Sequence, residues 1–220
     1  MKQKRTLDDV DVVGKKVLVR VDYNVPVLPE SPETISDDSR IRHSLPTLRY
    51  LSSQRCKMII CSHLGRPAGK VSKHLRLQFV AERLSELLNL SVESTKECIG
   101  ENVVRKASAL RNGDILMLEN LRFHPEEETN DSLFAAKLAS LADIYVNDAF
   151  GAAHRSHASI AAITKFLPSV AGPLMTKEIA ALGRVLNDPV PPLGAIFGGA
   201  KILDKINVLK NLAPTTEQLF

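Results

Sequence analysis

The chain has 220 residues, enough for one or two domains, and its 44% hydrophobic and 25% charged residues are typical of a globular protein. Aromatic residues make up only 5%, with no tryptophan, so we expect no surface that stacks single-stranded nucleic acid. Lys and Arg outnumber Asp and Glu by 29 to 25, and no basic run is long enough to follow a phosphate backbone. This mild positive charge suits a small anionic ligand.

Short apolar runs alternate with helical patterns along the chain. The runs predict strands at 17–21, 57–61, 90–92, 115–118, 144–146 and 193–197. Apolar or Ala/Leu-rich helical spacing predicts helices at about 41–51, 77–88, 132–141 and 176–186. We expect Pro46 to bend or start the first of these helices. This β-then-α alternation predicts an α/β fold, with a parallel sheet covered by helices on both faces.

The clearest break in the pattern of strands and helices is the proline-rich stretch Pro189-Val190-Pro191-Pro192. We therefore expect a first domain over residues 1–175 and a connecting helix and linker over 176–190. Residues 191–220 would then begin a second domain.

The three cysteines, Cys56, Cys61 and Cys98, have no CxxC or Cys/His spacing, so neither a disulfide framework nor a zinc site is indicated. Cys61 ends an apolar run and is expected to be a buried hydrophobic residue rather than a nucleophile. The N-terminus is charged before any apolar stretch, and no apolar run approaches the ~18 residues of a membrane span. We expect a cytoplasmic protein without a signal peptide.

Polar and charged segments follow the predicted strands, and ligands of open parallel sheets bind at the carboxyl ends of strands. The first four segments contain Asp22-Tyr23-Asn24, Ser62-His63-Leu64-Gly65-Arg66, Glu119-Asn120-Leu121-Arg122 and Asn147-Asp148 followed by His154-Arg155-Ser156-His157. Arg66, Arg122 and Arg155 should meet at one edge, where like charges repel unless an anion neutralises them. Arginine matches phosphate and carboxylate bidentately, so we predict a small ligand bearing these groups. Asp22 and Asn24, taken alone, could also be turn-forming residues.

Three further patterns are weaker. Gly198-Gly199-Ala200-Lys201 follows a predicted strand and could approach a phosphate, but it is not a P-loop, and no GxGxxG occurs. His154 and His157 lack a third ligand at metal-binding spacing, so we expect no protein-bound metal. Glu126-Glu127-Glu128 is most simply a solvated helix start.

Six stretches together resemble the phosphoglycerate kinase family, in family order. They are Arg20–Pro26, Ile35–Ile41, Ser62–Pro67, Leu118–His124, Asn147–Ser159 and Gly198–Ile206. The resemblance implies a Rossmann-like three-layer lobe that binds phosphoglycerate, followed by the first βα unit of a second, similar lobe that binds nucleotide.

The resemblance also implies an activity: reversible transfer of the acyl phosphate of 1,3-bisphosphoglycerate to ADP, giving 3-phosphoglycerate and ATP. The implied catalytic residues are Arg40 and Lys201. The implied phosphoglycerate-binding residues are Asp22, Tyr23, Asn24, Arg40, His63, Leu64, Gly65, Arg66, Arg122 and Arg155. The implied residues on the side of Mg-ATP or Mg-ADP are Gly198, Gly199, Ala200, Lys201 and Lys205. The expected partners are these small molecules, with no nucleic acid and no membrane, and the expected state is a monomer.

The sequence departs from the family pattern at three places. Ile202-Leu203 stands where the family often has a small residue before Asp204. Tyr23 stands where the family usually has Phe, and family chains run to about twice this length. After Leu209 the family's next strand and glycine turn are expected, whereas the sequence ends at Phe220. The alternative hypothesis is therefore a truncated, non-catalytic fragment that binds phosphoglycerate.

Overall fold

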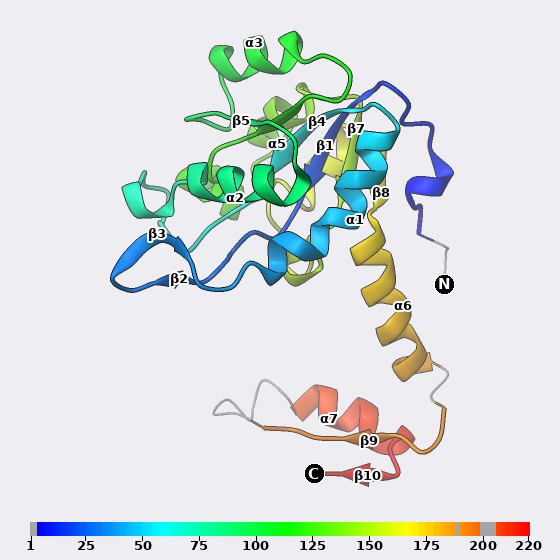
Figure 1. The fold of residues 1–220 in the computed structure, drawn as a ribbon. Coiled ribbons are helices and arrows are strands. Elements are labelled where there is room, and N and C mark those ends of the chain that lie inside the picture. Colours follow the sequence, from blue (N-terminus) through cyan, green and yellow to red (C-terminus); the bar gives the residue numbers. More distant parts are fainter. Residues whose placement is uncertain (1–3, 188–189, 199–205) are drawn as a thin grey trace. The chain divides into compact units, whose positions relative to one another are not determined.

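The computed structural model describes residues 4–187, 190–198 and 206–220. The chain divides into two compact units, residues 1–176 and 177–220 (Figure 1). Within the described ranges, no helix has the length and apolar character needed to cross a membrane.

The first unit is built on one six-stranded sheet. Its strands are β1 (Lys16–Arg20), β4 (Lys57–Cys61), β5 (Val92–Ser94), β6 (Ile115–Met117), β7 (Ile144–Asn147) and β8 (Ser169–Ala171). They pair in the order β5-β6-β4-β1-β7-β8, and every pair is parallel. A separate antiparallel hairpin is formed by β2 (Val27–Leu28) and β3 (Ser31–Ile35). The predicted parallel sheet is confirmed.

Helices cover both faces of this sheet. Val17 and Val19 of β1 lie in one buried cluster with Ile41 of α1 (Ser39–Ser53) and Val80 of α2 (Gln78–Leu88). Leu18 lies in a second cluster with side chains of α3 (Glu101–Ala109) and α5 (Ser132–Ala139). Alternate residues of a strand point to opposite faces, so this apolar strand supplies both cores. Burying each such side chain contributes about 1.5–3 kcal/mol.

The parallel register brings the carboxyl ends of four strands to one edge. Arg20, the last residue of β1, pairs with Cys61, the last of β4, and with Asn147, the last of β7. Ile60 of β4 pairs with Met117, the last residue of β6. The segments that follow these four strands therefore begin beside one another.

The elements differ from the prediction in several places. The strand expected at 90–92 is β5 at Val92–Ser94, and Pro46 lies inside α1 instead of starting it. The helix start expected at Glu126–Glu128 is the short helix α4 (Pro125–Glu128). The prediction missed the β2–β3 hairpin, α3 and β8. It also missed 3-10 helices at Leu7–Asp9, Lys73–Leu75, Leu121–Phe123, Phe150–Ala152, Ala162–Lys165 and Ala213–Thr215. The missed elements of the first unit are short or carry few apolar residues, so their local signal is small.

The second unit has its own small sheet. The strand expected at 193–197 is β9 (Gly194–Ala195), which pairs in parallel with β10 (Gln218–Leu219). Helix α7 (Ile206–Leu212) precedes β10 in the chain. The predicted helix 176–186 lies within α6 (Pro173–Asn187), whose first turn belongs to the first unit.

Candidate functional site

The segments after β1, β4 and β6 are tied together by direct hydrogen bonds. The backbone N–H of Gly65 donates to Asn24 Oδ1 at 2.8 Å, and Arg122 Nη1 donates to the Gly65 carbonyl at 2.8 Å. Gly65 has φ +62°, and a Cβ there would lie 2.7 Å from Leu75 Cδ2, so only glycine fits this junction without strain. Three segments distant in sequence therefore meet at Gly65.

The segment after β7 joins the same place through Asp22 and Arg40. Arg40, in the first turn of α1, donates to Asp22 Oδ2 at 2.5 Å. Gly151 packs so closely that a Cβ would lie 2.6 Å from that oxygen. Asp22 also accepts a local hydrogen bond from the Asn24 N–H at 3.2 Å, so it forms a turn as well as an ion pair.

We call Arg40, His63, Arg66, Arg122 and Arg155 the cationic rim. Arg66 is exposed and Arg155 half-buried, and within the described residues neither side chain has a hydrogen-bond or ion-pair partner. Burial lowers the pKa of Arg122, and the nearby Arg155 and Arg20 lower it further, against the opposing effect of Glu128. Arg122 Nε lies 3.2 Å from Glu128 Oε1 without hydrogen-bond geometry. Arg40 and Arg122 each have one carboxylate nearby, whereas Arg66 and Arg155 have none among the described residues, so part of the positive charge of the rim is not neutralised.

His63 is the neutral member of the rim. Burial lowers its pKa to about 2, and Arg20, Arg122, His157 and Arg155 add to the effect. Its Nδ1 lies 3.1 Å from Arg20 Nη2. A guanidinium can only donate, so Nδ1 accepts and Nε2 carries the proton. Among the described residues no group pairs with Nε2, which leaves one N–H to donate to an anion.

Asn120 connects the loops that carry Leu64, Leu75 and Arg122, and the sequence did not single it out. Its side chain is fully buried. Its Oδ1 accepts from the N–H groups of Leu64 (3.3 Å) and Arg122 (3.1 Å), and its Nδ2 donates to the carbonyls of Leu64 (2.8 Å) and Leu75 (2.9 Å). The adjacent Glu119 accepts from Arg76 at 2.7 Å. An asparagine after a strand is common in turns, so no local signal marks this role.

A second buried set of polar side chains, Arg20, Ser159 and Glu127, is hydrogen-bonded to His63 through Arg20. Arg20 is 1% exposed, and its Nε donates to Ser159 Oγ at 2.9 Å. Ser159 Oγ in turn donates to Glu127 Oε1 at 2.6 Å. Glu127 is fully buried, so the expectation of a solvated Glu126–Glu128 run is wrong at this residue. Glu127 lies in the first turn of α4, which turns its side chain toward the core.

Two of the ten expected phosphoglycerate residues have side chains that point away from the open rim. Tyr23 is fully buried, with its hydroxyl 2.6 Å from Ser44 Oγ, and burial raises its pKa. Leu64 is 3% exposed, and both its backbone groups bond to Asn120. These two side chains support the loops that carry His63 and Asn24, and the assignment of Tyr23 and Leu64 to phosphoglycerate stays a prediction.

The expected nucleotide residues Gly199, Ala200, Lys201 and Lys205 lie outside the described residues, and Gly198 belongs to the second unit. Within the described ranges, no three His, Cys, Asp or Glu side chains are grouped to hold a metal ion. Cys61 is fully buried, as expected, and burial raises its pKa to about 12. It is therefore a packed thiol and not a nucleophile.

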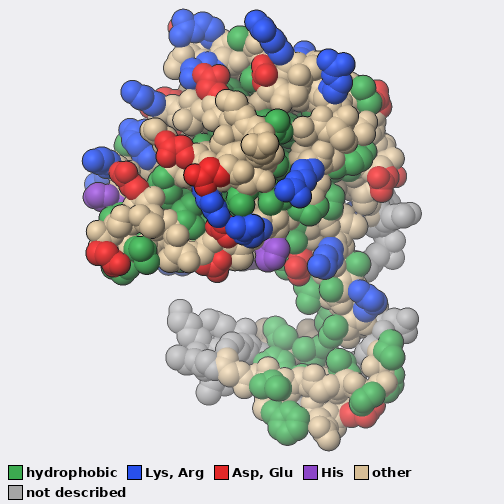
Figure 2. Space-filling view, in the orientation of Figure 1, with side chains coloured by type: hydrophobic (Ala, Val, Ile, Leu, Met, Phe, Trp, Pro, Cys, Tyr) green, Lys and Arg blue, Asp and Glu red, His purple; other side chains and the backbone are tan. Residues whose placement is uncertain are grey.

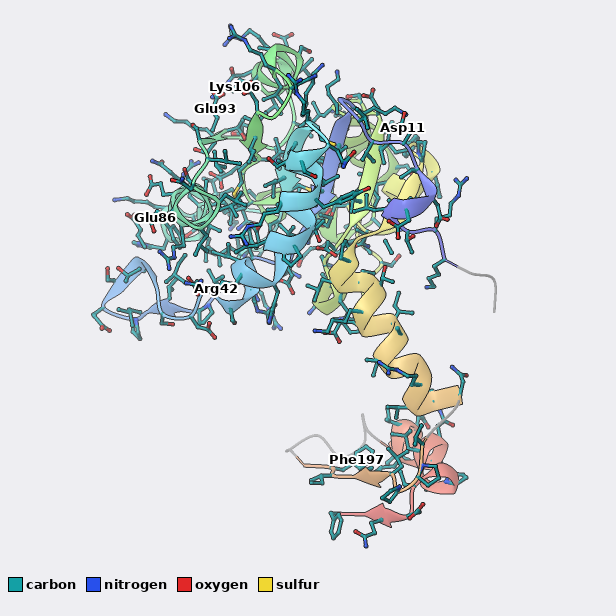
Figure 3. All side chains as sticks on the ribbon, turned by 45° about the vertical axis from the view of Figure 1, so that its right-hand side comes forward. Asp11, Arg42, Glu86, Glu93, Lys106 and Phe197 are labelled. Carbon is teal, nitrogen blue, oxygen red and sulfur yellow. The ribbon has the colours of Figure 1, made fainter. Side chains whose placement is uncertain are left out.

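A hollow of about 630 Å³ lies away from the rim, between β3 and the helices α1 and α2. Figure 3 labels two of its residues, Arg42 on α1 and Glu86 on α2. Asp38 binds Arg42 at 2.7 Å and Arg83 at 2.7 Å, so the cations of this hollow are already paired. On the face that carries α1 and α2, positive and negative side chains are interspersed (Figure 2). Unpaired positive charge therefore favours the rim over this hollow as the anion site.

The comparisons with known proteins agree on one family. The family model for phosphoglycerate kinase matches residues 7–220. Phosphoglycerate kinases of Moorella thermoacetica and Dictyoglomus turgidum are 52% and 54% identical to the chain over 98% and 96% of its length. The chain spans about half the length of these curated relatives, 54% and 53%.

Solved structures give the same result. The phosphoglycerate kinase of Coxiella burnetii is 35% identical, with a TM-score of 0.85 over 99% of this chain and 54% of its own. That of Pyrococcus horikoshii is 34% identical, with a TM-score of 0.88 over 98% of this chain and 54% of its own. By sequence and by fold, the chain belongs to the phosphoglycerate kinase family.

Proposed function

We propose that the first unit binds 3-phosphoglycerate or 1,3-bisphosphoglycerate at the cationic rim, as part of a kinase that transfers the acyl phosphate to ADP. One observation carries this proposal: Arg66 and Arg155 are without partners among the described residues. Arg155 acts electrostatically on the buried Arg122 and on the neutral His63, and Arg66 follows Gly65, whose carbonyl accepts from Arg122. A phosphate or carboxylate placed there relieves the repulsion among the guanidinium groups.

The residues of the cationic rim would have different roles toward the ligand. Arg66, Arg122 and Arg155 would bind the phosphate and carboxylate oxygens bidentately, and His63 would donate its Nε2–H. Arg40 is 45% exposed while bonded to Asp22, so its remaining N–H groups would stabilise charge on the phosphoryl group in transfer. Phosphoryl transfer depends mainly on positioning and charge neutralisation, and this set needs no covalent nucleophile.

The nucleotide side of the proposal rests on family membership. We propose Gly198, Gly199, Ala200, Lys201 and Lys205 as the nucleotide contacts, with Lys201 near the transferred phosphate. In the part of the chain that the structure describes, no three His, Cys, Asp or Glu side chains are grouped to bind Mg²⁺.

Calorimetric titration with 3-phosphoglycerate tests the rim. Arg66→Ala and Arg155→Ala should each weaken binding about tenfold or more, because a hydrogen bond to a charged group contributes about 1.5–3 kcal/mol. The matched control is Arg105→Ala: Arg105 is exposed on α3 and bonds only to Asn102 among the described residues. Equal affinities for all four proteins would contradict the assignment.

The same variants give a second readout. Removing an unpaired cation from a crowded rim should leave the free energy of unfolding unchanged or slightly higher, since repulsion falls. Lost binding with retained stability therefore separates a ligand site from a structural role. A coupled assay with Mg-ADP and 1,3-bisphosphoglycerate measures whether this chain also transfers the phosphoryl group.

A further inference from the structure

A continuous chain of buried hydrogen bonds runs from a carboxylate to the rim histidine. It passes from Glu127 through Ser159 and Arg20 to His63. We propose that Glu127 and Ser159 are positioning residues, which set the orientation and tautomer of His63 through Arg20. This inference rests on the proposed function, in which His63 contacts phosphoglycerate.

Ser159 has only one way to satisfy its neighbours. Its hydroxyl proton goes to Glu127 Oε1 at 2.6 Å, because an ionised carboxylate only accepts. The hydroxyl oxygen must then accept from Arg20 Nε at 2.9 Å. The Ser159 N–H donates to Glu127 Oε2 at 2.9 Å, and its carbonyl accepts from the Tyr145 hydroxyl at 2.6 Å. Four bonds therefore fix both the place and the direction of this hydroxyl.

Arg20 transmits that direction. With Nε directed at Ser159, Nη1 donates to the Val21 carbonyl and Nη2 meets His63 Nδ1 at 3.1 Å. The guanidinium is planar, so fixing Nε also fixes Nη2. A donor held against Nδ1 keeps the imidazole proton on Nε2, the nitrogen left for the ligand.

The charge of Glu127 has a second effect. Glu127 is fully buried among cations, with Oε1 3.9 Å from His157 Nδ1. Burial lowers the pKa of His157, and Arg122 and Arg155 add to the effect, whereas Glu127 and Glu128 oppose it. A carboxylate beneath the rim offsets the repulsion between guanidinium groups without occupying the surface that the ligand needs. Glu127 thus stabilises the rim without competing for the anion.

Nitrogen NMR of the imidazoles tests the relay in the ligand-free protein. In the unmodified chain, His63 should show one tautomer, protonated at Nε2, between pH 5 and 8. Ser159→Ala removes the link between Glu127 and Arg20, so His63 should populate both tautomers, and 3-phosphoglycerate should bind about tenfold more weakly. Ser140→Ala is the matched control, since Ser140 is exposed and its hydroxyl bonds, within the described part of the chain, only to the carbonyl of Lys137 one helix turn earlier.

Glu127→Gln provides an independent measurement should Ser159→Ala fail to fold. It removes the charge at nearly constant shape, so the pKa of His157 should fall and His63 should again show mixed tautomers. A single Nε2–H tautomer retained in the folded variants, with unchanged affinity, overturns the relay. If the unmodified chain does not bind 3-phosphoglycerate, the proposed function fails, while the tautomers still decide the relay.

Discussion

Replacing Asn120 by alanine removes one side chain that satisfies four backbone groups; three of these bonds are buried, and the bond to the Leu75 carbonyl is partly buried. These are the N–H and carbonyl of Leu64, the carbonyl of Leu75 and the N–H of Arg122. An unsatisfied buried polar group costs about 1–3 kcal/mol, and water entering the vacated space recovers part of it. At about 1 kcal/mol for each of four groups, Asn120→Ala should lower the free energy of unfolding by about 4 kcal/mol.

The assay is urea unfolding followed by far-ultraviolet circular dichroism, because the chain has no tryptophan to report by fluorescence. With a urea slope of about 2 kcal/mol per molar, the midpoint should fall by about 2 M. Asn102→Ala is the matched control, since Asn102 is exposed on α3 and its side chain accepts, among the residues that the structure describes, only from Arg105. It should change stability by less than about 0.5 kcal/mol.

A binding measurement on the same variant tests whether Asn120 also supports the cationic rim. Asn120 sets the places of Leu64 and Arg122, so Asn120→Ala should also weaken 3-phosphoglycerate binding in the fraction that remains folded. A loss of stability under about 1 kcal/mol would refute the reasoning, because it would mean that water satisfies the loop groups as well as the amide does. Normal binding despite a large loss of stability would separate Asn120 from the rim.

Three other predictions concern single residues. Gly65→Ala should lower the free energy of unfolding by about 1–2 kcal/mol and weaken 3-phosphoglycerate binding, because φ is +62° and the new Cβ meets Leu75; urea unfolding and calorimetry measure the two effects. Gly113→Ala is the control for backbone strain alone, since Gly113 has φ +94° and open space around it. Equal losses of stability in the two variants would rule out the clash with Leu75. The pKa of His63 is lowered from 6.5 to about 2 in the folded protein. Between these two values the unfolded chain binds a proton at His63 and the folded protein does not, so the free energy of unfolding should fall as pH decreases below about 6.5. His63→Gln should reduce that slope by up to ~1.4 kcal/mol per pH unit between pH 6 and 4, and an unchanged slope in urea unfolding would contradict it. Asp148 accepts from the N–H groups of Leu174 (2.9 Å) and Met175 (3.2 Å) at the start of α6. Asp148→Ala should therefore lower the free energy of unfolding by about 1–2 kcal/mol and speed hydrogen exchange at both amides. Unchanged exchange at these amides would exclude a capping role for Asp148.

Much of the first unit could be predicted because its strongest elements have local signals. The run Val17–Val21 is apolar and β-branched, which predicts a strand buried on both faces, and β1 lies at the centre of the sheet. The strand β8 was missed because Ser169–Ala171 is three residues long between Pro168 and Gly172. Its identity as a strand comes from pairing with β7, which no local pattern encodes.

The site divides in the same way. Arg66, Arg122 and Arg155 were predicted at one edge because each follows a parallel strand. The electrostatic influence of Arg122 and Arg155 on His63 places these two arginines near His63, and the position of the Arg66 side chain stays a prediction. Asn120 and Glu127 were missed because their roles depend on partners 45 to 56 and 32 residues away. Burial of Tyr23 likewise follows from its contact with Ser44, on the helix that covers the sheet.

The sequence by itself determined the α/β alternation, the apolar strands and the charged segments that follow them, because periodicity and turn residues act over a few positions. Only the tertiary structure decided which charges stay free. Arg66 and Arg155 remain unpaired within the described residues, while Arg20 is buried against Ser159 and His63. All three are arginines near strand ends, and they differ only in what the fold places beside them. Burial and pairing depend on distant segments, and these set the charge and the protons that the site presents to an anion.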